Sequence, residues 1–300
     1  MIMRKLLFYF CKMITKRAAA VFIVVCLSGN LYAQENDNIL KLGLLPNLSH
    51  MEILQTFSPF IKALENETKM SVKAISGKDY SAVIEMLKNK EIDVCPLGGI
   101  SLLAAADTFG VKIFARTLET IRPDKPPNEA YHSVIITRKD SGINSLEYLK
   151  GKRFSFTDPK SSSGFLFPMV ALIRHSIRLE NLGKVVYVKK HPNSLLAVFN
   201  RQTDAGALSE DIFIRGTGVN PNELKVLWKS EPIMRGPWVA RNDFPDEKLA
   251  IVKSAFLNIS RQKDAKQIFA KSFIKGFVPA KMSDYDNFRD VMKLKASLEK

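Results

Sequence analysis

Short apolar runs alternate with stretches of helical spacing along most of this 300-residue chain. The first run, "ILKLGLLP" at 39–46, has the length and composition of a strand and ends at a proline. Residues 51–67 then place apolar side chains every three or four positions, as on one buried helix face. Strands are also expected at 70–76, 92–98 and 111–117, and helices at 80–89 and 100–110. This alternation predicts an α/β fold with parallel strand pairs.

The pattern restarts after a proline-rich connection, "RPDKPPNEA", at 122–130. A second α/β unit, about Ile136–Trp228, is therefore expected to lie inserted within the first, and the tail 246–300 to be largely helical and charged. Two lobes joined by two crossings of the chain predict a cleft for a small ligand. The expected divisions are a signal peptide at 1–33, a first lobe at 34–135, a second lobe at 136–230, and completion of the first lobe with C-terminal helices at 231–300.

The first 33 residues have the composition of a secretory leader. They hold five basic residues and no acidic one, an apolar core at 18–28, and a small residue, Ala33, before the polar "QENDN". The core is too short to span a bilayer comfortably. We therefore expect export to the periplasm and cleavage after Ala33. A membrane anchor, either the uncleaved leader or a lipid on Cys26, is the alternative.

The net charge and the cysteines limit the choice of partners. The formal charge of +15 falls to +10 without the leader, which fits anionic small molecules or an anionic membrane surface. No nucleic-acid partner is expected, because the positive charges are dispersed. Only Cys95 lies outside the leader, so the mature chain has no internal disulfide. Its place at the end of an apolar run predicts a buried small hydrophobe.

The stretch "FTDPKSSSGFLFP" at 156–168 places three hydroxyls and a glycine before an apolar run. If a helix begins after Lys160, the stretch Ser161, Ser162, Ser163 and Gly164 forms its first turn. The first N–H groups of a helix have no internal acceptor, and the macrodipole makes that end positive. With serine hydroxyls as further donors, and a glycine that lets a ligand approach the backbone, this turn would hold a tetrahedral oxyanion. The alternative is a helix cap followed by a polar loop.

Five segments together carry a family pattern: "KLGLLP", "DYSAVIEML", "AYHSVIITRKDSGINSLEYLKGKRFSFTDPKSSSGFLFP", "HPNSLLAVFNRQTDAGA" and "VLWKSEPI". In these segments the chain resembles the periplasmic substrate-binding proteins of ABC importers for phosphate, phosphite and phosphonates. The resemblance covers about Leu40–Gly276. It implies an α/β fold of the type II periplasmic-binding-protein kind: two lobes, each a mixed sheet flanked by helices, with the ligand cleft between them.

The resemblance also implies roles for single residues. The turn Ser161–Gly164 corresponds to the phosphonate-binding turn of the family, and Tyr80, Tyr131 and His191 correspond to ligand-contacting residues. A tyrosine hydroxyl or an imidazole N–H can donate to an anion, and a bound anion would favour protonated histidine. The alternatives are a strand-end aromatic in the core for Tyr131 and a simple helix cap for His191.

Two acidic residues, Glu210 and Asp211, have two interpretations. The resemblance implies that Asp211 pairs with the amine of an aminoalkylphosphonate. A second acidic residue expected near "SEPI" is missing, and Arg235 and Gly236 stand there instead. We therefore do not assume 2-aminoethylphosphonate, since Arg235 could meet an anion or a ligand carboxylate. A solvated acidic pair on a loop is the alternative, and Asp204 is expected to be structural.

The sequence as a whole predicts a binding protein that closes on a phosphonate or a phosphate-like oxyanion. No enzyme activity, cofactor or metal site is expected, because no nucleophile motif, phosphate loop or metal-ligand spacing is present. The expected partner is an ABC permease. A membrane sensor kinase or cyclase is the alternative, and an enzyme on the same fold is a second one. We expect a monomer.

Overall fold

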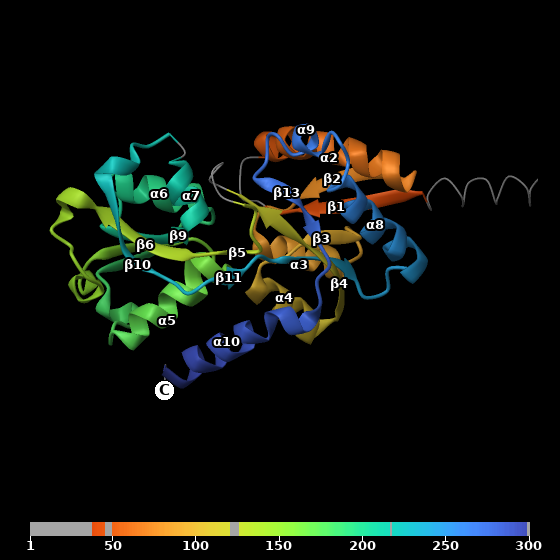
Figure 1. Ribbon diagram of the computed structural model, residues 1–300. Coiled ribbons are helices and arrows are strands. Elements are labelled where there is room, and N and C mark those ends of the chain that lie inside the picture. The colour runs from red at the N-terminus through yellow and green to blue at the C-terminus, as the bar shows by residue number, and fades with distance from the viewer. Residues whose placement is uncertain (1–37, 46–49, 121–125, 217, 299–300) are drawn as a thin grey trace, which may run out of the picture.

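The computed structural model describes residues 38–45, 50–120, 126–216 and 218–298, which form two α/β lobes side by side (Figure 1). The predicted fold class, two lobes each with a mixed sheet flanked by helices, is confirmed. The expected signal peptide, its cleavage site and Cys26 lie outside the described residues. No helix in the described ranges is both long and apolar enough to cross a bilayer.

The first lobe is built on a six-stranded sheet in the order β13-β4-β12-β3-β1-β2. β1 pairs in parallel with β2 and β3, whereas β12 is antiparallel to β3 and β4. Because β12 follows the second lobe in sequence, the returning chain completes this sheet. The strands are β1 (Ile39–Leu44), β2 (Ser71–Ser76), β3 (Val94–Pro96), β4 (Val111–Glu119), β12 (Pro237–Arg241) and β13 (Ile274–Val278). The helices are α2 (His50–Thr68), α3 (Tyr80–Lys88), α4 (Gly99–Thr108), α8 (Asp246–Ile259) and α9 (Ala265–Ile268).

The second lobe has a five-stranded sheet in the order β10-β6-β9-β7-β8. Its strands are β6 (Ser133–Arg138), β7 (Arg153–Phe156), β8 (Lys184–Tyr187), β9 (Ala205–Ser209) and β10 (Leu224–Lys229). Its helices are α5 (Phe167–Arg174), α6 (His191–Phe199) and α7 (Glu210–Arg215), with a π-helical turn, η3 (Ser162–Leu166), before α5. The sheet begins at Ser133, three residues before the expected start of this lobe at 136.

Side chains alternate between the two faces of each sheet, as the two-residue period of a strand requires. In β6, Ile135 joins the buried cluster under α5, while Val134 and Ile136 join the cluster under α6 and α7. In the first lobe, the leucines of β1 pack with α2 and α8, and the opposite face packs with α3 and α4. Cys95 is fully buried in that second cluster as an unpaired thiol, as predicted.

Two chain crossings join the lobes, as the restart of the sequence pattern predicted. They pair with each other as a short antiparallel ribbon of β5 (Ala130–Tyr131) and β11 (Ile233–Met234). β5, which contains Tyr131, therefore lies at the junction of the two lobes (Figure 1).

The C-terminal helix α10 (Asp286–Leu298) connects the lobes a third time. It runs from the first lobe to the underside of α5 in the second (Figure 1). Phe288, fully buried in the first-lobe core, meets Phe167 of the second lobe edge to face, with ring centroids 5.8 Å apart. Within 231–300, expected to complete the first lobe and to add C-terminal helices, the last helix thus also packs on the second lobe. The tail also contains a strand, β13, that the helical pattern did not predict.

Candidate functional site

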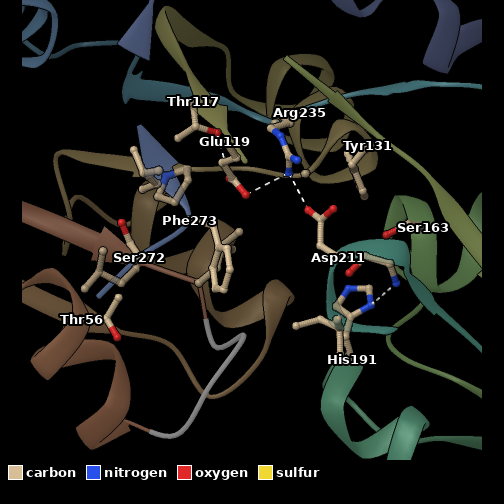
Figure 2. A pocket seen from close by; sticks show the side chains of 18 of the residues that line it. Thr56, Thr117, Glu119, Tyr131, Ser163, His191, Asp211, Arg235, Ser272 and Phe273 are labelled. Carbon is tan, nitrogen blue, oxygen red and sulfur yellow. Dashed lines mark hydrogen bonds and ion pairs between the residues drawn. The ribbon is translucent and has the colours of Figure 1, made fainter. Parts of the chain in front are cut away.

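A cavity of about 310 Å³ lies between the lobes and takes its walls from both of them. This volume is at the lower end of the range of about 300–1,000 Å³ that is usual for small-molecule sites. Of the residues named from the sequence, Tyr80, Tyr131, Ser161, Ser162, Ser163, His191 and Asp211 line it, and Gly164 does not. Figure 2 shows Ser163 and His191 on one side of the cavity and Thr56, Ser272 and Phe273 on the other.

Several helices begin at this cavity. Tyr80 is the first residue of α3, Gly98 is the N-cap of α4, Ser162 opens η3, and His191 is the first residue of α6. All four line the cavity. Helix starts present unpaired N–H groups and the positive end of the macrodipole, so the second-lobe and first-lobe walls both favour a negative charge.

The serine turn is held in shape by its own hydrogen bonds. The Lys160 N–H donates to Oδ1 of Asp158 at 2.7 Å, and the Gly164 N–H donates to Oγ of Ser161 at 3.0 Å. Oγ of Ser162 accepts from the Ile100 N–H across the cleft at 3.4 Å. Because the Ser162 oxygen accepts a backbone N–H, its hydroxyl proton remains available as a donor to a ligand.

A helix begins after Lys160 as predicted, but its first turn is π-helical rather than α-helical. The Leu166 N–H bonds five residues back to the Ser161 carbonyl at 3.1 Å. Pro168 has no N–H to close an α-helical bond onto Gly164, whose carbonyl instead accepts from the Thr157 N–H at 3.1 Å. The proline therefore favours the wide turn that carries the three serines.

Gly164 has a different role from the expected one. A Cβ at this position would collide with Oγ1 of Thr157, so no side chain fits between the turn and the segment after β7. The close approach that requires glycine is to the protein's own chain and not to a ligand. Gly164 thus allows the serine turn to pack closely against Thr157.

The two tyrosines lie at the turn and remain protonated at neutral pH. Burial raises the pKa of Tyr80, which hydrogen bonds with Ser161. Burial raises the pKa of Tyr131 to about 12, and this phenol hydrogen bonds with Ser163. Both hydroxyls are therefore neutral groups able to donate to an anion.

His191 is held as a neutral imidazole. Its Nδ1 accepts the Ser209 backbone N–H at 3.0 Å, so Nε2 carries the proton of the neutral ring (Figure 2). Burial lowers its pKa to about 4, with Asp211 opposing the shift. A proton on Nδ1 would face the Ser209 N–H, so this geometry opposes a charged ring; that a bound anion favours the protonated form stays a prediction.

Asp211 is buried rather than solvated, and one of its carboxylate oxygens is paired with an arginine. Its Oδ2 accepts from Nη1 of Arg235 at 2.7 Å, and the same nitrogen donates to Oε2 of Glu119 at 2.9 Å (Figure 2). The other oxygen of Glu119 accepts from Oγ1 of Thr117 at 3.1 Å. Burial alone would lower the pKa of Arg235, but the two carboxylates raise it above its usual value.

Sequence reasoning missed Glu119 and Arg215. Glu119 ends β4 and carries no local signal, since only the fold brings it to the cleft. Arg215 ends α7, and its guanidinium lies over the Phe273 ring of the first lobe. The other two acidic residues discussed from the sequence form ion pairs. Glu210 pairs with Lys229, and Asp204 pairs with Arg153, both at 2.7 Å. Asp204 is thus structural, as predicted.

No group of three or more His, Cys, Asp or Glu side chains within the described ranges is arranged to hold a metal ion. The cavity's chemistry, as far as the described residues go, is that of hydrogen-bond donors, helix starts and one ionic cluster.

The chain is similar to several known proteins. Residues 42–285 match the family model of the ABC transporter, phosphonate, periplasmic substrate-binding protein. The phosphonates-binding periplasmic protein of Escherichia coli is 27% identical over 260 residues, or 84% of this chain and 75% of the relative. The phosphate-import protein PhnD of Mycolicibacterium smegmatis is 25% identical over 282 residues, or 86% of each chain.

Among solved structures, PhnD1 of Prochlorococcus marinus in complex with methylphosphonate has a TM-score of 0.75 and 26% sequence identity. The match covers 85% of this chain and 97% of that one. Since the family model spans most of the chain, the chain belongs to the family of periplasmic substrate-binding proteins of phosphonate ABC transporters.

Proposed function

We propose that this protein captures a phosphonate or a phosphate-like oxyanion in the cleft between its lobes and presents it to the permease of an ABC importer. The observation that carries the proposal is the convergence of the serine turn, Tyr80, Tyr131 and His191 on one end of the cavity. A tetrahedral oxyanion needs donors on several sides, and these groups come from both lobes.

The donors at this end of the cavity are neutral. The tyrosines stay protonated and His191 stays neutral, so the charge of the ligand would be met by oriented dipoles and helix starts. Hydrogen bonds to a charged group each contribute about 1.5–3 kcal/mol, so that four or five support tight binding.

The two lobes would close around the ribbon of β5 and β11, with the ligand contacting Tyr80 from the first lobe and Ser161–Ser163 and His191 from the second. The closed form is the one that a membrane partner would recognise. Because the family is one of transport proteins rather than enzymes, we expect no turnover of the ligand. We also expect export through the leader at 1–33, a periplasmic location and a monomer.

Calorimetric titration of the purified protein with phosphate, phosphite, methylphosphonate and ethylphosphonate tests this function. We expect saturable binding of at least one compound. Ser162→Ala should weaken it by about ten-fold or more, since one charge-assisted hydrogen bond is lost. The matched control is Ser254→Ala, an exposed serine in α8. Absence of binding to all four compounds would refute the proposal.

A further inference from the structure

The end of the cavity away from the serine turn has its own chemistry. Glu119, Asp211, Arg215, Arg235 and Lys271 all line the cavity, which gives three basic side chains and two acidic ones. Tyr131 connects the two ends, because it hydrogen bonds with Ser163 while Arg235, Asp211 and Glu119 all influence its pKa. A phosphonate seated at the turn would therefore direct its substituent toward this charged cluster.

Both carboxylates of the cluster already have partners. Arg235 donates to Asp211 at 2.7 Å and to Glu119 at 2.9 Å, and Thr117 donates to the second oxygen of Glu119. A ligand ammonium would have to displace Arg235 or lie beside it. Arg235 therefore lies where a ligand ammonium would meet these carboxylates, and its guanidinium repels such a group.

Arg215 differs from Arg235 because no carboxylate of the described chain pairs with it within 4 Å. Its Nε is buried without a hydrogen-bond partner, and so is Nε of Arg235. The Arg215 side chain crosses the cleft to lie over the Phe273 ring of the first lobe. Burial lowers its pKa to about 10, more than the nearby charges of Glu119 and Asp211 raise it. An unpaired N–H of a buried guanidinium is a costly group that a carboxylate would satisfy.

We propose that Arg215 forms a second anion subsite and that the preferred ligand is a phosphonate with a carboxylate on its substituent. This proposal rests on the proposed function. The phosphonate lies at the serine turn, and the carboxylate meets the free donors of Arg215, with Lys271 at the exposed edge. Phe273 holds the guanidinium from the first lobe, so the subsite is complete only when the lobes are closed.

Three compounds of matched size test the subsite: 3-phosphonopropionate, propylphosphonate and 2-aminoethylphosphonate, which end in a carboxylate, a methyl and an ammonium at the same position. We expect 3-phosphonopropionate to bind at least ten-fold more tightly than propylphosphonate, and 2-aminoethylphosphonate to bind more weakly than propylphosphonate. In Arg215→Met the ratio between the first two should fall to about one. In Arg261→Met, a control at an exposed arginine outside the cavity, the ratio should persist.

The outcomes separate the two proposals. If propylphosphonate binds but 3-phosphonopropionate binds no more tightly, or if the preference survives Arg215→Met, the subsite is refuted and the oxyanion function stands. If none of the three binds, both proposals fail. Circular dichroism shows whether Arg215→Met folds. If it does not, the ratio of the two affinities in the unmodified protein, for 3-phosphonopropionate and propylphosphonate, tests the subsite by itself.

Discussion

Nη1 of Arg235 donates to Asp211 of the second lobe at 2.7 Å and also to Glu119 of the first lobe. Arg235 itself directly follows β11, on the chain crossing that leads back to the first lobe. The Arg235 and Asp211 side chains are only 7% and 11% exposed. The carboxylate that the resemblance implied as an acceptor for a ligand amine thus has one oxygen in an internal ion pair. This pair links both lobes at the hinge and changes which substituents the cleft can accept.

Removing Arg235 should destabilise the protein strongly. Arg235→Met leaves Asp211 and Glu119 buried without their common partner, and breaking such a pair costs about 3–5 kcal/mol. Asp211→Asn should cost less, because Arg235 keeps Glu119. Urea unfolding measures both values. Arg289→Met, which removes an exposed pair with Asp107, is the control and should have a smaller effect. Equal losses for all three variants would contradict a structural role for the buried pair.

His191 should make the stability fall in mildly acidic solution. The folded protein keeps this imidazole neutral down to about pH 4, whereas the unfolded chain takes up the proton near pH 6.5. The unfolded state therefore binds more protons between these values, and the free energy of unfolding decreases as the pH falls through this window, by at most roughly 3 kcal/mol.

The slope of unfolding free energy against pH should be shallower in His191→Gln. His175→Gln, which removes an exposed histidine that contacts Glu147, should keep the slope that His191 causes. An unchanged slope in His191→Gln would show that the imidazole is not held neutral.

Gly164→Ala should cost more than Gly142→Ala. Gly142 has a φ of +72° but nothing within 4 Å of an added methyl group, so alanine there meets only backbone strain of about 1–2 kcal/mol. At Gly164 the methyl group collides with Thr157 and must displace the serine turn. Thermal unfolding and ligand titration should both be affected at 164, whereas only unfolding should be affected at 142. The reverse order would contradict the steric role of Thr157.

Phe288→Ala should show that α10 contributes to stability. The ring is fully buried and contacts Gly99 and Phe167, so its removal should cost about 3–5 kcal/mol. Met292→Ala on the same helix removes a side chain that is 40% exposed and should change the unfolding free energy by about 0.5 kcal/mol or less. Similar small losses in both variants would mean that the helix does not fasten the lobes.

Local patterns allowed much of this architecture to be predicted. The serine turn follows from short-range sequence, because its helix start, its cap and its apolar continuation all lie within 156–168. The two lobes follow from the restart of the strand and helix pattern after the proline-rich connection. The positions of His191 and Tyr80 at helix starts also follow from the local sequence.

Features set by distant parts of the chain could not be predicted. Glu119 and Arg235 are 116 residues apart, and neither sequence neighbourhood indicates their contact. Gly164 looked like a point of ligand approach, whereas Thr157 occupies the space behind it. The π-helical turn could not be predicted either. Pro168 has no N–H to donate to the Gly164 carbonyl, and the donor that replaces it, the Thr157 N–H, follows the neighbouring strand β7.

A crystal structure of the protein with methylphosphonate tests the central claim most directly. We expect phosphonate oxygens within about 2.5–3.2 Å of the Ser161–Ser163 donors, Tyr80 and Nε2 of His191, with Arg235 still paired to Asp211. A phosphonate group bound instead between Arg215 and Lys271, with the serine turn unoccupied, would contradict the claim.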